Sequence, residues 1–269
     1  MKKKFENVLF ICHCVLFLIL FSSCQMFTTS LGKPFQRNQK DFLKKASASE
    51  LLAFSQGPNA SNNETVKAVL DLLSEKAPEE LKALPLGDKE AALNLTLDAT
   101  LPMKKVSQIL EEAQTLTGGG GGNPEQLVKN LLNGIDTFDT TASTQLLSDN
   151  EAMKNAKPDA LANAAVAVIV QVAAKNGGYD KIKQNIQAGG GNLSFKDDTA
   201  DTIVTKMLGA SASQEDKDTL KAAVNAAKLL SGAANAQDSA GQTVTRPGLD
   251  PKNIKLLGAV PLESILGAF

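Results

Sequence analysis

The chain has 269 residues, with 28 basic and 29 acidic side chains and a net charge of −1. This length suits one large domain or two small ones, and the balanced charge argues against nucleic acid as a partner. All three cysteines and the single histidine lie within the first 24 residues. The remaining chain therefore lacks the side chains for a Cys/His metal site, a serine–histidine triad or an internal disulfide. We expect no metal, no cofactor and no catalytic residues, and hence no enzyme.

Residues 1–23 have the layout of a secretory signal peptide. Lysines at positions 2–4 make a positive start, and residues 8–21 form an apolar run interrupted only by His13. The small residues Ser22 and Ser23 then precede Cys24. The run is shorter than the ~20 apolar residues of a membrane-spanning helix. The sequence therefore predicts an exported chain.

The motif Phe21-Ser22-Ser23-Cys24 resembles the lipobox of bacterial membrane lipoproteins, in the looser form found in spirochaetes. Phe21 stands where the family usually has Leu. Cys12 and Cys14 follow Ile11 and His13, which are too large for this cleavage.

This resemblance implies cleavage between Ser23 and Cys24 and acyl chains, such as palmitate, on Cys24. Two or more chains would hold the protein firmly in the cell membrane or the outer membrane, with an extracytoplasmic, periplasmic body. An ordinary cleaved signal and an uncleaved anchor remain alternatives.

Residues 24–37 follow as the acylated cysteine and a short tether rich in Thr, Ser, Gly and Pro. Helix patterns then fill residues 38–117, which we expect to form an N-terminal helical half. Helices are predicted over 38–55, 64–76, 88–100 and 102–116, with a capping box at 61–64 and a further helix start at Pro78.

The glycine run 118–122, with Asn123, is predicted to be a flexible linker over residues 118–123. No strand pattern precedes it and no Gly-Lys-Ser/Thr follows it, so a phosphate-binding loop is not expected. It separates the first half from a C-terminal helical half, residues 124–269, which begins with Asn123-Pro124-Glu125 in the order of a helix start.

The most apolar stretch of the second half is 161–174, where only Asn163 and Gln171 are polar. Because a helix that is apolar all round is buried, we expect the central core helix here. Its valines and isoleucine leave a buried strand open as an alternative. Before it lie a threonine-rich connection, 137–150, and a second capping box at 148–151, with Ser148 as the cap.

The remaining stretch continues the helical pattern. Helices are predicted between the glycines at 177–178 and 189–191, over 197–209 and over 214–231, followed by a loop at 232–247, a cap at Asp250-Pro251 and an apolar segment at 254–269. No alternating strand pattern recurs. The sequence therefore predicts an all-α fold of about ten helices, either a multi-helix bundle or an irregular helical-hairpin solenoid.

Adjacent carboxylates are candidates for a glycosidase-type pair, but such a pair needs two acids across a cleft, which adjacency in sequence does not supply. They occur at Glu79/Glu80, Glu111/Glu112 and Asp197/Asp198. Two of these pairs fall at predicted helix starts, where acids complement the helix dipole, so we do not assign them catalysis.

Asp216-Lys217-Asp218 begins like a calcium loop. Leu220 and Lys221, however, occupy the positions of the third oxygen ligand and the turn glycine. We therefore expect no calcium site.

We expect a membrane-anchored envelope lipoprotein with a non-catalytic interaction or scaffold body that binds an envelope protein. The alternative is a ligand-binding lipoprotein that holds a small apolar molecule between its helices for a transport system. A cavity lined by Leu, Val and Phe would favour the alternative, whereas a filled core with an exposed apolar patch would favour a scaffold. Residues 254–269 either dock into a partner or form the last core element.

Overall fold

The computed structural model describes residues 43–56, 63–101, 111, 123–132, 135, 137–238, 240–256 and 260–267. The predicted signal peptide, Cys24, the tether and the five glycines lie outside these ranges, as do Ser61 and Asn62 of the predicted capping box and all of the predicted helix at 102–116 except Glu111. The chain divides into two compact units, Met1–Ala46 and Ser47–Phe269. Only residues 43–46 of the first unit are described, so the account below concerns the second.

The described residues are 68% helical, in 13 helices, and 3% strand, which confirms the predicted all-α fold of about ten helices. In chain order the elements are α3 (Ala48–Gln56), α4 (Asn63–Ser74), α5 (Pro78–Lys82), α6 (Leu86–Thr100), α8 (Pro124–Leu132), α9 (Thr141–Leu147), α10 (Asn150–Asn155), α11 (Pro158–Lys175), α12 (Gly178–Ala188), α13 (Ala200–Leu208), α14 (Gln214–Leu230), the 3-10 helix η1 (Pro251–Asn253), β1 (Lys255–Leu256), β2 (Val260–Pro261) and α15 (Leu262–Leu266).

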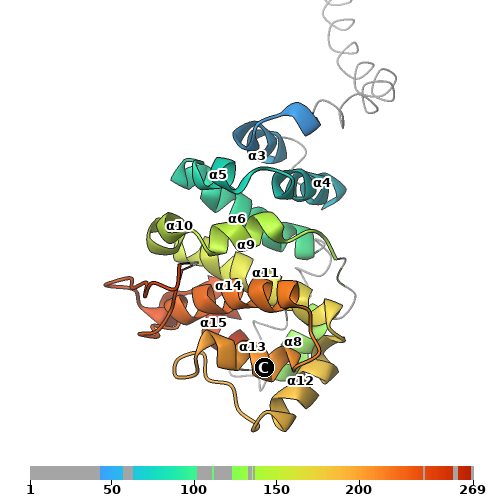
Figure 1. Cartoon of the computed structure of the whole chain (residues 1–269), viewed down its shortest axis with the longest axis vertical. Helices are drawn as coiled ribbons and strands as arrows, with labels where there is room; N and C mark the ends of the chain where they lie inside the picture. Colours follow the sequence, from blue (N-terminus) through green and yellow to red (C-terminus); the bar gives the residue numbers. More distant parts are fainter. Residues whose placement is uncertain are drawn as a thin grey trace, which may run out of the picture. The chain divides into compact units, whose positions relative to one another are not determined.

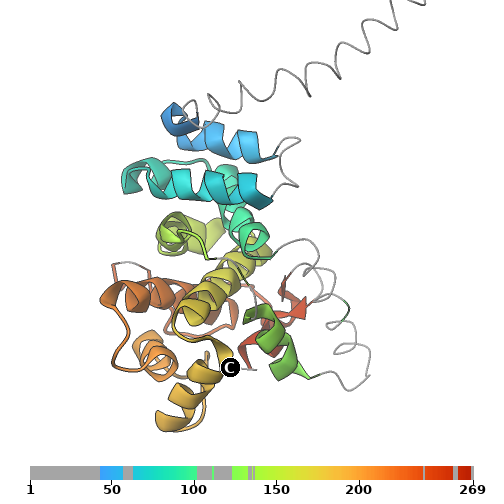
Figure 2. The ribbon, with the colours of Figure 1, turned by 90° about the vertical axis from the view of Figure 1, so that its right-hand side faces the viewer.

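Helix α11 is the centre of the core, and it lies between α6 and α14 (Figures 1 and 2). Every residue from Ala160 to Ala173 except Asn163 is buried. The prediction of a core helix here is confirmed, and the alternative of a buried strand is wrong. Among the described helices, α11 is also the one long and apolar enough to cross a membrane, but its burial within the protein explains the same composition.

Helices from both sides of the glycine run pack on one another. Helix α6 contacts α11, and α9 contacts α4, α5 and α14 (Figure 1). A strict solenoid places each unit only against its neighbours in sequence, so these long-range contacts make the body a bundle. The division into two halves at 118–123 stays a prediction.

The connection predicted over 137–150 contains a helix that the sequence pattern did not reveal. Asp139 Oδ1 accepts a hydrogen bond of 2.8 Å from the amide of Thr141, where α9 begins. Ala142, Leu146 and Leu147 of α9 are buried. Threonine is a weak helix former, so burial of these apolar side chains decides the conformation.

The cap of the second predicted capping box lies one residue later than the sequence predicted. The cap of α10 is Asp149, not Ser148, and its Oδ1 accepts a 2.8 Å hydrogen bond from the amide of Ala152. Glu151 does not reach back to the cap but pairs with Lys89. The starts of α13 and α14 do follow the rule, with Thr199 and Ser213 as side-chain caps.

The C-terminal segment is not helical throughout. Strands β1 and β2 form an antiparallel pair, with Leu256 opposite Val260, and β1 packs on α11. Helix α15 then packs on α8. Six apolar side chains of this segment are buried: Ile254, Leu256, Val260, Leu262, Ile265 and Leu266. These residues are therefore part of the core.

Candidate functional site

Three polar clusters stand out in the described part of the chain, and the first surrounds Lys89 of α6. Lys89 is fully buried, and its Nζ donates a 3.1 Å hydrogen bond to Asp149 Oδ1 and a second one to Glu151. Burial opposes the charge on Lys89, but the two carboxylates outweigh burial and raise its pKa. The cluster joins α6 to the start of α10, so its role is structural.

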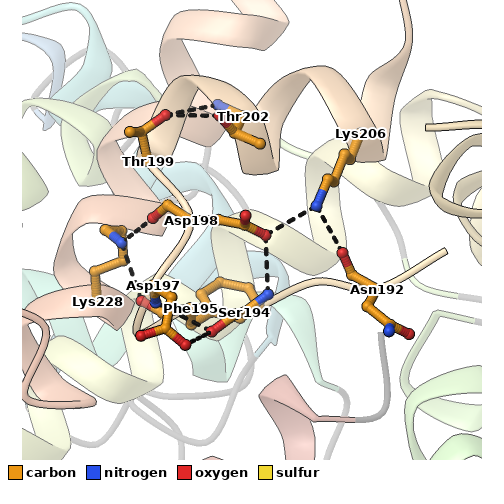
Figure 3. Close-up of polar contacts among 9 residues, drawn as sticks. All are labelled: Asn192, Ser194, Phe195, Asp197, Asp198, Thr199, Thr202, Lys206 and Lys228. Carbon is orange, nitrogen blue, oxygen red and sulfur yellow. Dashed lines mark hydrogen bonds and ion pairs between the residues drawn. The ribbon is translucent and has the colours of Figure 1, made fainter. Parts of the chain in front are cut away.

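The second cluster surrounds Lys228 of α14, also fully buried (Figure 3). Its Nζ donates to the backbone carbonyls of Phe195, at 3.1 Å, and of Asp198. Burial lowers the pKa of Lys228, and the nearby charges of Asp198 and Asp197 offset this only in part. Lys228 thereby fixes the loop before α13 to the side of α14.

The same loop is tied down from α13 (Figure 3). Lys206 Nζ lies 3.1 Å from Asp198 Oδ2 and donates a 2.7 Å bond to the carbonyl of Asn192. Burial opposes the charge on Asp198, but the amide of Ser194 and Lys206 outweigh it and hold the pKa of Asp198 below its usual range. Lys206 and Asp198 pair with each other within the protein. The loop is therefore held in place by its own contacts and is not the candidate binding site.

The third cluster lines an open groove of about 890 Å³ between α9, α11 and α14. Figure 1 shows these three helices lying next to one another. Its lining is predominantly hydroxyl, amide and carboxylate: Thr137, Phe138, Asp139, Thr140, Thr141, Thr144, Gln145, Gln171, Val172, Lys175, Glu215, Asp216, Asp218 and Thr219. Because it is open and polar, this groove is the candidate functional site.

One ion pair crosses the groove lining. Lys175 Nζ, at the end of α11, lies 2.8 Å from Asp216 Oδ1 in the first turn of α14. The hydrogen bond that Lys175 donates to the Asp216 carboxylate raises the pKa of Lys175. Burial opposes the charge on Asp216, but Lys175 and Ser213 outweigh it and lower the pKa of Asp216. Among the described residues of the lining, the only cation is thus already paired.

The remaining acids give the groove a negative surplus. Asp139, Glu215 and Asp218 are exposed, and Lys175 forms its ion pair with Asp216 rather than with any of them, although Glu215 attracts Lys175 through space. Asp139 accepts the amide of Thr141, and Asp218 accepts from Gln214 Nε2 at 2.9 Å. Such neutral donors leave the carboxylate charge in place, so the lining carries four carboxylates against one ammonium.

Behind the groove, a buried polar network joins three helices. Thr96 of α6 and Ser143 of α9 share a 2.7 Å hydrogen bond. Thr100 Oγ1 donates to the carbonyl of Thr96 at 2.8 Å and accepts from Gln171 Nε2 at 3.4 Å. Gln171 is 4% exposed and also lines the groove. The network therefore fixes the groove's floor to α6.

Gln145 of α9 carries an acceptor without a donor. Its Oε1 is shielded from solvent and has no hydrogen-bond partner in the protein. An unpaired buried acceptor costs roughly 1–3 kcal/mol. Another part of the Gln145 side chain lines the groove.

The carboxylates of the described residues do not gather into a metal site. No group of three or more Asp, Glu, His or Cys side chains among them could hold a metal ion. Asp216 and Asp218, considered above for calcium, lie in the first turns of α14. Their spacing along a helix differs from a loop that wraps its oxygens around one ion.

The sequence-predicted sites have different outcomes. Ser23 and Cys24 lie outside the described residues, so cleavage and lipidation stay predictions. Glu79 and Glu80 lie in the first turn of α5, as expected for dipole complementation.

Asp197 and Asp198 do not begin a helix. They lie in the turn before α13, where Asp197 accepts from Ser194 Oγ at 2.7 Å. Of the third pair, only Glu111 is within the described residues.

Sequence reasoning missed the groove and both buried lysines. The run of threonines at 140–144 was a visible signal, since hydroxyls are otherwise poor choices for a helix. Lys228 was another, because it interrupts an apolar run from Ala226 to Leu230. No family model, curated protein or solved structure matches the chain, so its function must be inferred from its own residues.

Proposed function

We propose that the protein is a bacterial envelope lipoprotein whose helical body binds a protein partner and catalyses no reaction. Acyl chains on Cys24 hold it in the cell membrane or the outer membrane, with the body outside the cytoplasm. The run Phe21-Ser22-Ser23-Cys24, at the end of a short apolar segment, is the observation that carries this function. Two or more acyl chains bind a bilayer stably, whereas one does so only marginally.

The composition of the body supports binding over catalysis. No histidine or cysteine follows Cys24. The groove offers hydroxyls, amides and carboxylates, which are the groups that recognise a polar partner. A carrier of a small apolar molecule would present Leu, Val and Phe, but Phe138 and Val172 are the only large apolar side chains among the described residues of this lining. The groove therefore favours the interaction body over the apolar-ligand carrier.

The anchor is tested by expressing the full chain in a bacterium with an alkyne-tagged palmitate. Wild type is expected to be labelled and to fractionate with membranes, and Cys24→Ala is expected to lose both properties. The chain supplies matched controls, because Cys12→Ala and Cys14→Ala should leave labelling unchanged. Labelling that persists in Cys24→Ala, or that disappears in either control, contradicts the proposed anchor.

The body is tested on the same acylated protein, extracted in detergent and measured by native mass spectrometry. We expect the mass of the acylated chain without a retained small molecule. A bound molecule of defined mass that survives repeated dilution would contradict the interaction body and support the alternative, a carrier of a small apolar molecule.

A further inference from the structure

We propose that the groove between α9, α11 and α14 binds an extended peptide segment that carries lysine or arginine side chains. This inference rests on the proposed interaction body and names the chemistry of its partner. The occupant is a segment of another protein, recognised through its cationic side chains and its backbone.

Charge is the first reason. The lining has four carboxylates and one lysine, and that lysine is held 2.8 Å from Asp216. Glu215 also attracts Lys175 through space, but this one ammonium is already paired with Asp216, so the described lining keeps a surplus of negative charge toward a ligand. Opposite charge on a partner steers its encounter and fixes its register in the groove.

The distance between the carboxylates indicates which kind of cationic ligand fits the groove. The described residues contain no acidic cluster tight enough to hold a metal ion. The acids instead come from the segment before α9 and from the first turns of α14, on two sides of the groove. A ligand with separated ammonium or guanidinium groups fits this arrangement better than a single ion.

Hydrogen bonding separates a peptide from a simple polyamine. Gln145 lines the groove and its Oε1 has no partner in the protein, so we infer that its amide turns toward a bound ligand and accepts an N–H donor. Thr144 Oγ1 already donates to the carbonyl of Thr140, but the hydroxyls of the other lining threonines can donate to carbonyl oxygens, which a polyamine lacks. A peptide backbone supplies both. The volume of about 890 Å³ lies at the upper end for ligand pockets and has room for several residues.

The test uses the full acylated chain in detergent and a fluorescent peptide, Gly-Lys-Gly-Lys-Gly, followed by fluorescence anisotropy. The Lys peptide should bind, more weakly at high salt because its contacts are charged. The same peptide with Glu in place of Lys should not bind. Binding of both peptides, or of neither, overturns the proposal. Spermidine is the competitor for the polyamine outcome, and spermidine binding tighter than the peptide also overturns it.

Variants locate the binding. The double variant Glu215→Gln/Asp218→Asn should weaken the Lys peptide roughly tenfold or more, because two charge-assisted contacts are lost. The matched control Glu79→Gln/Glu263→Gln removes two exposed acids outside the groove and should leave binding unchanged. Equal weakening in both pairs means non-specific attraction and contradicts the groove.

Gln145→Met provides a second variant that should not impair folding. It replaces an unpaired acceptor, so the thermal midpoint should stay the same or rise, while peptide affinity should fall several-fold. Unchanged affinity contradicts the role given to Gln145. Failure of these binding tests with Cys24 labelling intact would overturn the peptide groove and leave the lipoprotein proposal standing.

Discussion

The Nζ of Lys89 lies 3.1 Å from Oδ1 of Asp149, and the same oxygen accepts the amide of Ala152 at 2.8 Å. One carboxylate thus neutralises a buried cation of α6 and caps the start of α10. Residues 60 positions apart in the chain are fixed to each other by this oxygen.

Replacing Asp149 should therefore remove two interactions at once. Asp149→Ala is expected to lower the free energy of unfolding by about 2–4 kcal/mol, the sum of a lost helix cap and a weakened buried ion pair. Asp149→Asn keeps a capping oxygen and should cost less. Ser148→Ala, the cap expected from the sequence alone, should change stability by under about 0.5 kcal/mol. Urea unfolding measures the free energy of unfolding of the three variants. If Ser148→Ala loses as much of it as Asp149→Ala, Asp149 is not the cap.

The two buried lysines should respond to pH in opposite directions. The pKa of Lys228 is lowered, so below the ordinary value of about 10.4 the unfolded chain binds more protons than the folded one. Stability contributed by Lys228 must then rise as pH approaches that value. The pKa of Lys89 is raised, so its contribution is complete below about 10.4 and is lost as pH rises through the folded value.

Urea unfolding of wild type, Lys228→Met and Lys89→Met over a series of alkaline pH values measures these slopes. The difference between wild type and Lys228→Met should increase toward about pH 10.4. The difference between wild type and Lys89→Met should be flat over that range and decline above it. Parallel slopes for the two variants would contradict the assigned environments.

The Thr96–Ser143 hydrogen bond should show coupling in a double-mutant cycle. Thr96→Val leaves a buried Ser143 without its 2.7 Å partner and should cost about 1–3 kcal/mol. Adding Ser143→Ala removes the orphaned hydroxyl, so the double variant should lose less than the sum of the single variants. We expect a coupling of at least about 0.5 kcal/mol in thermal or urea unfolding. Strict additivity contradicts a shared hydrogen bond.

Two glycines should respond oppositely to alanine. Gly87 lies in the first turns of α6 with nothing within 4 Å of an added Cβ, so Gly87→Ala should stabilise by about 0.4–1 kcal/mol. Gly177 has a φ of +99°, and an added Cβ would lie 3.0 Å from Lys181. Gly177→Ala should therefore destabilise by about 1–2 kcal/mol. Thermal unfolding tests both, and a stabilised Gly177→Ala would contradict the backbone geometry.

Local signals were enough to predict the helical class and the central helix. Helix α11 could be read from the sequence because Pro158 opens it and almost every following residue is apolar. The helices that begin at Pro78 and Pro124 could be predicted for the same reason, since proline suits the first turn of a helix. These features depend only on neighbouring residues, which a single sequence displays.

Contacts between distant residues could not be predicted in this way. Helix α9 has too many threonines for its own propensity and is held by burial of Leu146 and Leu147. The groove needs α9 and α14 side by side, although about 70 residues separate Thr144 from Asp216. The partner of Lys89 likewise comes from another helix. A single sequence contains no signal for such pairings.

Strand β1 covers α11, and this contact limits how early the core can form during folding. The amide of Lys255 donates to Asp159 in the first turn of α11, a contact between residues 96 positions apart. The core is therefore complete only when the buried side chains of this segment are in place: Ile254, Leu256, Val260, Leu262, Ile265 and Leu266. Helix α11 therefore cannot be fully covered until a segment synthesised long after it is available.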